Sequence, residues 1–138
     1  MPNPSHRRRL VVVGVLAAVA GVAARLTAAA PGHDHAAHAK PRHGGLVKDA
    51  GELTYELLVT PTRIDVWVEE HGKPTGTSGS TARLTLIDSG SRTEVTLAPA
   101  APNRFEAQGS YPVKKGMTAL LQVAVGGKEI AKIRYTLR

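Results

Sequence analysis

Cysteine is absent from this chain of 138 residues, which excludes a disulfide framework and removes thiolate both as a metal ligand and as a nucleophile. Methionine occurs only as Met1 and Met117, so a thioether site for a cuprous ion is not expected either. A folded domain of this chain must therefore be held together by its apolar core, and imidazole is the ligand expected for any transition metal.

Sequence motifs of common catalytic sites are also missing. There is no Gly-x-Ser-x-Gly, and no glycine-rich loop leads into a helix, so neither a hydrolase nucleophile nor a phosphate-binding loop is predicted. The pair Glu69-Glu70 stands at the end of a predicted strand, where we interpret it as an acidic edge. We therefore predict that the chain is not an enzyme.

A basic start and a short apolar run mark residues 1–30 as a targeting segment. Three arginines, Arg7 to Arg9, precede the fifteen uncharged residues Leu10–Ala24. This pattern is typical of a helical secretory signal, and the run is short for a membrane span, which needs about 20 apolar residues. An uncleaved anchor stays an alternative, as does a twin-arginine signal at Arg7-Arg8-Arg9-Leu10-Val11. We expect export and no membrane attachment after the signal is removed.

The net charge of +7 belongs largely to that segment. Without the four arginines of residues 1–30, fourteen basic and eleven acidic residues remain, a net charge of +3. The basic residues are scattered, and aromatic residues that could stack on bases make up only 4% of the chain. Nucleic acid is therefore not an expected partner.

From Leu46 onward, apolar and polar residues alternate with the period of two expected of strands that bury one face. No helical periodicity is seen after residue 30, and residues 71–80 are expected to form a loop. The fold class predicted for residues 43–138 is all-β, an antiparallel immunoglobulin-like sandwich of seven or eight strands. Besides a first strand after Gly45, strands are expected at 53–59, 62–70, 81–88, 92–98, 103–109, 117–125 and 129–137.

Two cross-strand alignments follow from the expected turns. A three-residue loop at 126–128 places Leu121 opposite Ile133, with the apolar residues of both strands on one face. A turn at Thr60-Pro61, flanked by Val59 and Thr62, places Glu56 opposite Asp65 on the outer face.

Most of the imidazoles stand directly before this domain. Residues 31–42 contain proline, glycine and alanine but no larger apolar residue, so they are expected to form a flexible linker. Neutral imidazole is a common ligand of transition metals, and several on one tether could wrap a single ion. The alternative is a polar spacer that is rich in histidine only by composition. The chain has six histidines, and four fall within eleven residues: His33, His35, His38 and His43.

Several motifs of the domain resemble small exported β-sandwich proteins, which are similar to N-terminal segments of periplasmic adaptor subunits of heavy-metal efflux pumps. The resemblance covers residues 43–138, and it implies the periplasm and the handling of copper, nickel, cobalt or zinc. Carried over residue by residue, it implies roles for His43, Glu56, Glu70 and His71, although Glu70 stands where aspartate is usual. The motifs are HGGLV (43–47), YELLV (55–59), VEEHGKP (68–74), LTL (84–86) and APAAPNRFEAQGSY (98–111).

The expected pairing argues against one shared ion at His43 and His71. If the strand after Gly45 pairs with residues 53–59, His43 lies near Leu57, about six residues or ~20 Å from the end that carries His71. Metal ligands lie only about 2 Å from the ion. The two histidines could then meet only if the first strand crossed to the other sheet, which Gly44-Gly45 would permit.

We therefore predict a periplasmic, non-enzymatic protein that binds a divalent transition metal and acts as a buffer, a chaperone or an accessory of a metal-efflux pump. The alternative is a structural or protein-interaction module of the same fold without metal, in which the outward-facing Trp67 is an interface anchor or covers a sheet edge. The candidate metal ligands are His33, His35, His38, His43, His71 and Glu70.

Overall fold

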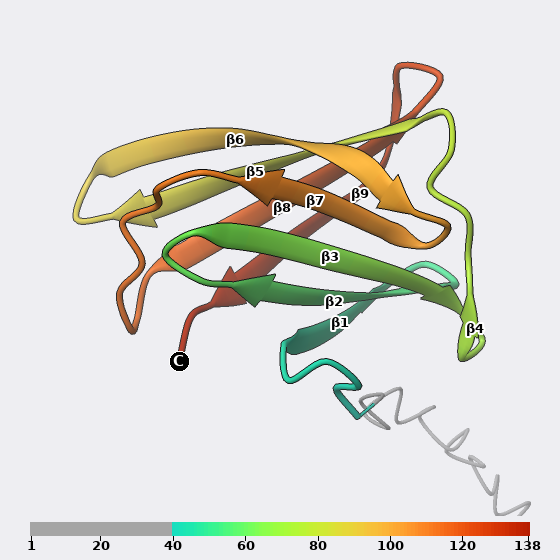
Figure 1. Ribbon diagram of the computed structural model, residues 1–138, viewed down its shortest axis with the longest axis horizontal. Helices are drawn as coiled ribbons and strands as arrows, with labels where there is room; N and C mark the ends of the chain where they lie inside the picture. Colours follow the sequence, from blue (N-terminus) through green and yellow to red (C-terminus); the bar gives the residue numbers. More distant parts are fainter. Residues whose placement is uncertain (1–39) are drawn as a thin grey trace, which may run out of the picture. The chain divides into compact units, whose positions relative to one another are not determined.

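The computed structural model describes residues 40–138, so the expected signal segment and His33, His35 and His38 lie outside the described residues. Within residues 40–138 the regular secondary structure consists of strands, and no helix there is long and apolar enough to cross a membrane. The prediction of an all-β domain is confirmed (Figure 1). The strands are β1 (Leu46–Ala50), β2 (Leu53–Val59), β3 (Arg63–Glu70), β4 (Lys73–Pro74), β5 (Ser80–Asp88), β6 (Ser91–Ala101), β7 (Arg104–Gln108), β8 (Thr118–Val125) and β9 (Lys128–Thr136).

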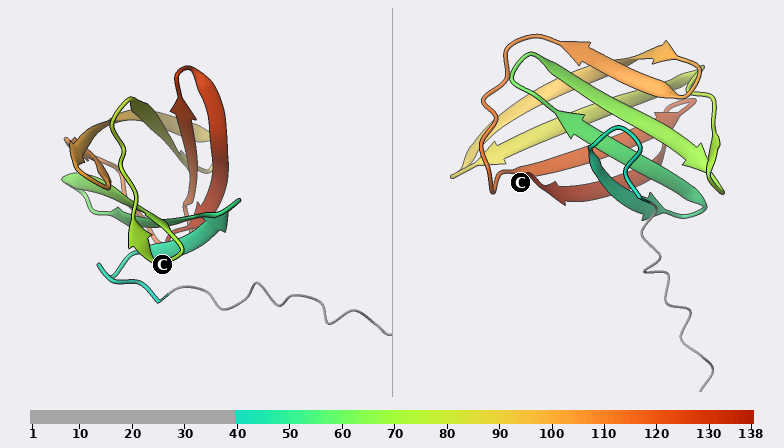
Figure 2. Two further views of the ribbon diagram at one scale, coloured as in Figure 1. Left: turned by 90° about the vertical axis from the view of Figure 1, so that its right-hand side faces the viewer. Right: turned by 60° about the horizontal axis from the view of Figure 1, so that its bottom comes forward.

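All strand pairs are antiparallel, in the order β1-β2-β3-β7-β6-β5-β8-β9, with the short β4 beside β3. Strand β6 belongs to two groups, because its first part pairs with β5 and its last part, from Ala98, pairs with β7. It thereby joins a group formed by β1, β2, β3 and β7 to a group formed by β5, β8 and β9. The ribbon curls so that the two groups face each other (Figure 2).

The core lies between the two groups. Alternate residues of β2, β3, β5 and β8 point into it, as their period of two predicts. The Tyr135 hydroxyl of β9 donates a hydrogen bond to the Tyr55 carbonyl of β2 at 3.1 Å, which ties one group to the other. Among residues 40–138, nineteen apolar side chains are buried, and fully burying a Val, Leu, Ile, Phe or Met side chain contributes roughly 1.5–3 kcal/mol. The core can therefore stabilise the domain without disulfides.

The predicted alignment of Leu121 with Ile133 is confirmed, although the loop that produces it differs from the expected one. The turn of the β8–β9 hairpin has two residues, Gly126 and Gly127, both with positive φ, and Val125 pairs with Lys128. Because the turn is one residue shorter than expected, β9 contains one extra residue, a bulge at Ile130 between the pairs Ala124–Glu129 and Val123–Ala131. A two-residue turn with a bulge gives the same register beyond it as a three-residue loop.

The predicted alignment of Glu56 with Asp65 is wrong. Glu56 pairs with Trp67, because Val59 pairs with Ile64 and the turn between β2 and β3 is two residues longer than expected. Thr60 closes this longer turn, since both its backbone N–H and its hydroxyl donate to the Arg63 carbonyl. A shift of two residues leaves each side chain on its predicted face but moves β3 along β2.

The expectation that residues 71–80 form only loop is wrong at Ser80, which begins β5, and at Lys73–Pro74. These two residues form β4, which pairs with Glu69 and Glu70 of β3 across the turn His71-Gly72. Both turn residues have positive φ, 49° and 77°, as a two-residue hairpin turn requires. The turn ends strand β3 and positions the residues of the candidate site that precede it.

Candidate functional site

The outer face of β2 and β3 carries the carboxylates of the candidate site. Ile64, Val66 and Val68 point into the core, so the residues between them, including Trp67 and Glu69, point outward. Glu56 of β2 lies opposite Trp67 and is only 6% exposed. An ionised side chain is this strongly buried only when other groups satisfy it.

The chain before β1 covers Glu56. Gly44 has a φ of +80°, and the chain reverses there, so residues 40–43 return across the outer face instead of extending β1 (Figure 2). A Cβ atom on Gly45 would lie 2.6 Å from the carbonyl oxygen of Leu57, so only glycine fits that close approach. We call residues 40–45 the strap. The two glycines of the HGG motif therefore have structural roles: one reverses the chain and the other lets the strap pack on β2.

Glu56 fastens the strap through four hydrogen bonds. Its carboxylate accepts the backbone N–H groups of Arg42 (3.0 Å), His43 (2.8 Å) and Gly45 (2.9 Å), and the Nδ1–H of His43 (2.9 Å). Burial alone would raise the pKa of Glu56, but these donors outweigh it and hold the pKa below its ordinary value. Glu56 is therefore an ionised anchor for the strap.

The imidazole of His43 is held from two sides. An ionised carboxylate can only accept, so Nδ1 carries the proton that is shared with Glu56. The ring stacks on Trp67 with 3.9 Å between ring centroids and 2° between the planes. The side chain is still 37% exposed, and within residues 40–138 its Nε2 has no hydrogen-bond partner. A histidine whose Nδ1–H is fixed by a carboxylate presents Nε2 as a metal ligand.

Arg42 extends the strap toward the end of β3. Its guanidinium lies 3.3 Å from the Glu69 carboxylate through Nη1 and donates from Nη2 to the Gly72 carbonyl at 3.2 Å. A cavity of about 10 Å³ remains beneath Arg42, between Glu56, Trp67 and Glu69, which is room for about one water. No ligand larger than a water molecule fits under the strap.

The other two residues implied by the resemblance make no hydrogen bond or ion pair with His43 or Glu56 within residues 40–138. Glu70 alternates with Glu69, so its side chain is on the opposite face from Glu56 and is exposed where β3 ends. His71 occupies the turn, in a left-handed conformation that histidine tolerates better than most residues. Among residues 40–138, no three His, Asp or Glu side chains are grouped to hold a metal ion. The structure thus brings His43 and Glu56 together and leaves Glu70 and His71 outside that pair.

A second group of charges continues along the same face. Arg63 and Arg104 flank the buried Asp65, at 2.8 Å and 3.6 Å from its carboxylate oxygens. Both arginines also reach Glu106 of β7, at 3.2 Å and 2.8 Å. A hydrogen bond from Gln108, followed by the charges of the two arginines, lowers the pKa of Glu106 despite partial burial. The carboxylates of Asp65 and Glu106 are compensated by cations, whereas the positioned imidazole of His43 stays partly exposed.

Sequence reasoning missed two residues of the cluster, Arg42 and Glu69, and the contact of Trp67 with His43. Strand parity could have found Glu69, because it alternates with Glu70 and shares the face of Trp67. Nothing in the pattern of residues shows that the strap folds back at Gly44. The contacts of Arg42 and the stacking of His43 on Trp67 depend on that reversal.

No protein-family model matches the chain, and no curated protein matches it. Among solved structures, it is similar to one titled "Crystal structure of Br derivative BhCBM56", with 11% sequence identity and a TM-score of 0.41. That likeness covers 67% of this chain and 99% of the other. A TM-score and identity this low support no conclusion about fold or function. Such conclusions are drawn from the residues described above.

Proposed function

We propose that the chain is an exported, periplasmic protein that binds a divalent transition metal and serves as a buffer, a chaperone or an accessory of a metal-efflux pump. Copper, nickel, cobalt and zinc all accept imidazole nitrogen, and Cu(II), Ni(II) and Zn(II) suit a set of ligands without sulfur best. The role is one of binding and delivery, without catalysis. As part of the same proposal, the two strand groups pack as an immunoglobulin-like sandwich.

The observation that carries the proposal is the arrangement of His43, Glu56 and Trp67. The carboxylate fixes the tautomer, the indole fixes the ring plane, and the imidazole side chain stays 37% exposed. Such second-shell support typically changes metal affinity by 10–100-fold. His43 would therefore be the anchored ligand of a site whose other ligands are mobile.

The remaining ligands would come from His33, His35 and His38. His38 precedes His43 by five residues, so an extended chain lets it reach up to about 17 Å. An ion bound to Nε2 of His43 lies within that reach, and His35 and His33 follow at short spacing. The strap fixes one end of the tract, which lowers the entropy lost when the ligands converge.

Calorimetric titration with Cu(II), Ni(II) and Zn(II) at neutral pH tests the proposal. Replacing His33, His35 and His38 together with alanine should remove most of the binding, and H43A should weaken it at least tenfold. H71A is the matched control, because it removes an exposed imidazole that lies outside the cluster. Equal affinity in wild type, H43A and the triple variant would overturn the proposal, and loss in H71A alone would move the site to the β3–β4 turn.

The second candidate is a structural or protein-interaction module, and one observation favours it. Within residues 40–138 Glu56 is fully engaged by the strap and Glu69 by Arg42, so the cluster is complete as a fold-stabilising device without an ion. Deleting residues 31–39 separates the two candidates. An interaction module should retain its partner after the deletion, whereas a metal-binding protein should lose most of its bound ions.

A further inference from the structure

The main strand order has two free ends, and the longer end strand is β9. The order begins with β1 and closes with β9, and within residues 40–138 neither strand pairs with another on its second side. β9 has nine residues, whereas β1 has five. An unpaired strand edge presents a row of backbone N–H and C=O groups that can pair with a further strand. The free edge of β9 is therefore a surface to which an extended chain can bind.

The hydrogen bonds between β8 and β9 show which residues face this edge. The Leu137 N–H donates to the Met117 carbonyl at 2.9 Å, so the backbone groups of Leu137 point toward β8. In an antiparallel pair, successive residues point their backbone groups alternately toward the partner strand and away from it. The register is regular beyond the bulge, so Lys132, Arg134 and Thr136 point theirs to the free edge. Their side chains are exposed on the outer face, whereas the residues between them are buried.

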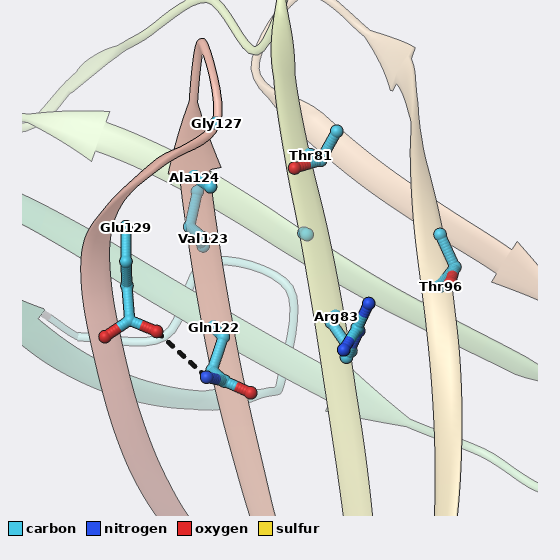
Figure 3. A pocket seen from close by; sticks show the side chains of 9 residues that line it. Thr81, Arg83, Thr96, Gln122, Val123, Ala124, Gly127 and Glu129 are labelled. Atoms are coloured by element: carbon cyan, nitrogen blue, oxygen red, sulfur yellow. Dashed lines mark hydrogen bonds between the residues drawn. The ribbon is translucent and has the colours of Figure 1, made fainter.

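The exposed side chains of β9 are mainly cationic. Lys132 and Arg134 stand two residues apart on the outer face, and Lys128 begins the strand. Within residues 40–138 none of these three cations forms an ion pair. The acidic residue of β9, Glu129, accepts a hydrogen bond from the side-chain amide of Gln122 on β8 at 2.9 Å (Figure 3). The cations of the edge are therefore not neutralised from their own strand.

Open hollows lie beside this edge, where β9 approaches β1 without pairing with it. One hollow has a volume of about 600 Å³ and lies between β1 and the end of β9. A second, of about 280 Å³, adjoins it and extends to the end of β2. Neither lining contains an aspartate or glutamate side chain, so a strand added to β9 would meet apolar walls on this side. The apolar residues of the two linings include Leu46, Leu57, Val113 and Leu137.

We propose that the free edge of β9 binds an extended segment of a partner protein in which acidic residues alternate with apolar ones. The segment adds antiparallel to β9, as the described strands of this sheet pair with each other. Its acidic side chains lie beside Lys132 and Arg134, and its apolar side chains face the hollows. In this mode of recognition backbone hydrogen bonds supply affinity, and alternate side chains supply specificity. The site does not use His43 and does not depend on metal binding.

The charges of β9 also decide between a partner and a second copy of the chain. Pairing of two β9 edges would bring the cations Lys132 and Arg134 of both copies close together, and like charges across strands are destabilising. Lysine on an edge strand protects it against self-association in this way. Acidic residues at the same positions make the cross-strand pairs attractive instead. The edge therefore disfavours a second copy and favours an acidic strand.

A blocked peptide that alternates glutamate and valine is a direct probe of this edge. It is titrated into the isotopically labelled full chain while the amide signals are followed. The amide signals of Lys132, Arg134 and Thr136 should shift, and exchange of these amides with solvent should slow, because the peptide supplies them with acceptors. A peptide with the same glutamates and valines in two separate blocks is the control and should not bind at the same concentration.

Methylated peptides test the backbone pairing separately from the charges. In the proposed pairing each glutamate lies opposite Lys132 or Arg134 and directs its own N–H to β9, whereas the valine N–H groups point away. Methylation of the glutamate nitrogens should therefore abolish binding, and methylation of the valine nitrogens should preserve it. Both peptides carry the same charge.

Charge-reversal variants complete the test. K132E/R134E should weaken the glutamate–valine peptide at least tenfold, because each cross-strand pair changes from opposite to like charge. A peptide that alternates lysine and valine should bind this variant instead. R83E/R92E changes the net charge equally on β5 and β6 and should leave binding within about twofold, since salt screens distant charges. Melting curves confirm that both variants fold.

Three results would overturn the proposal. The first is a glutamate–valine peptide that leaves the amide signals of β9 unshifted. The second is binding that survives methylation of the glutamate nitrogens, or that R83E/R92E weakens as much as K132E/R134E, because the attraction would then be nonspecific. The third is sedimentation of the chain with phosphatidylserine vesicles, lost in K132E/R134E, without peptide binding, which would assign the cations to a membrane surface.

Discussion

Charged side chains on the outer faces of the two strand groups differ in how deeply they are buried and how they are held. On β2 and β3, Glu56 is buried and held by four hydrogen bonds from a strap that crosses it. On β5 and β6, Arg83 and Glu94 form an ion pair between neighbouring strands, but their charged atoms are 3.8 Å apart and both side chains are mostly exposed. Water competes with the exposed ion pair of Arg83 and Glu94, whereas it is largely excluded from the buried carboxylate of Glu56. Glu56 thus gains its structural role because a further segment of chain covers it and supplies its hydrogen-bond donors.

The largest expected difference between the faces is in stability. E56A should lower the free energy of unfolding by about 3 kcal/mol, because it removes charge-assisted hydrogen bonds from the strap. E94A should change it by less than about 0.5 kcal/mol. Urea unfolding of the two variants measures both values. Similar values for both would mean that the strap does not stabilise the domain.

Crowding under the strap should give the next largest effect. G45A places a Cβ atom 2.6 Å from the Leu57 carbonyl oxygen, and the resulting shift of backbone should cost about 1–3 kcal/mol. G44A is its neighbour and control: it meets no atom within 4 Å but has a φ of +80°, so it should cost only about 1 kcal/mol. Thermal unfolding ranks the two. The strap geometry is contradicted if G44A is the more damaging change.

Acidification should reveal a smaller difference, in the pH dependence of the free energy of unfolding. The pKa of Glu56 is lower in the folded chain than in the unfolded chain, so its contribution is present above an unfolded pKa of about 4.3 and is lost as pH falls through the folded value. The free energy of unfolding of wild type should therefore fall below about pH 4.3 more steeply than that of E56A. Equal slopes for the two proteins between neutral pH and pH 3 would contradict the assigned role.

Metal removal should have the smallest effect on the fold. The core is formed by apolar side chains rather than by ligands around an ion, unlike that of zinc fingers, which unfold when metal is removed. Chelator should leave the melting temperature and the far-ultraviolet spectrum of the purified chain unchanged. A fall in either would reveal a structural metal in the domain.

The same comparison shows what the sequence could predict. Alternation predicted the strands and their inward faces, because a period of two reports which side of a strand is buried. It could not give the register between Glu56 and Trp67, because the extent of the Thr60–Arg63 turn depends on Thr60 hydrogen bonds. It could not show the strap either, because the two glycines at 44–45 permit several paths. The expected ligands His33, His35 and His38 lie outside the described residues and stay predictions.

Fluorescence of Trp67 during titration with Cu(II) tests the central claim most directly. Trp67 is the single tryptophan of the chain, and its indole stacks on His43 at 3.9 Å, so a paramagnetic Cu(II) ion on His43 Nε2 would quench it. We expect saturable quenching near pH 7.5 that is lost in H43A, retained in H71A and reversed near pH 5.5, where protons displace the metal from imidazole. Copper binding that leaves Trp67 fluorescence unchanged, or quenching that persists in H43A, would contradict a site anchored at His43.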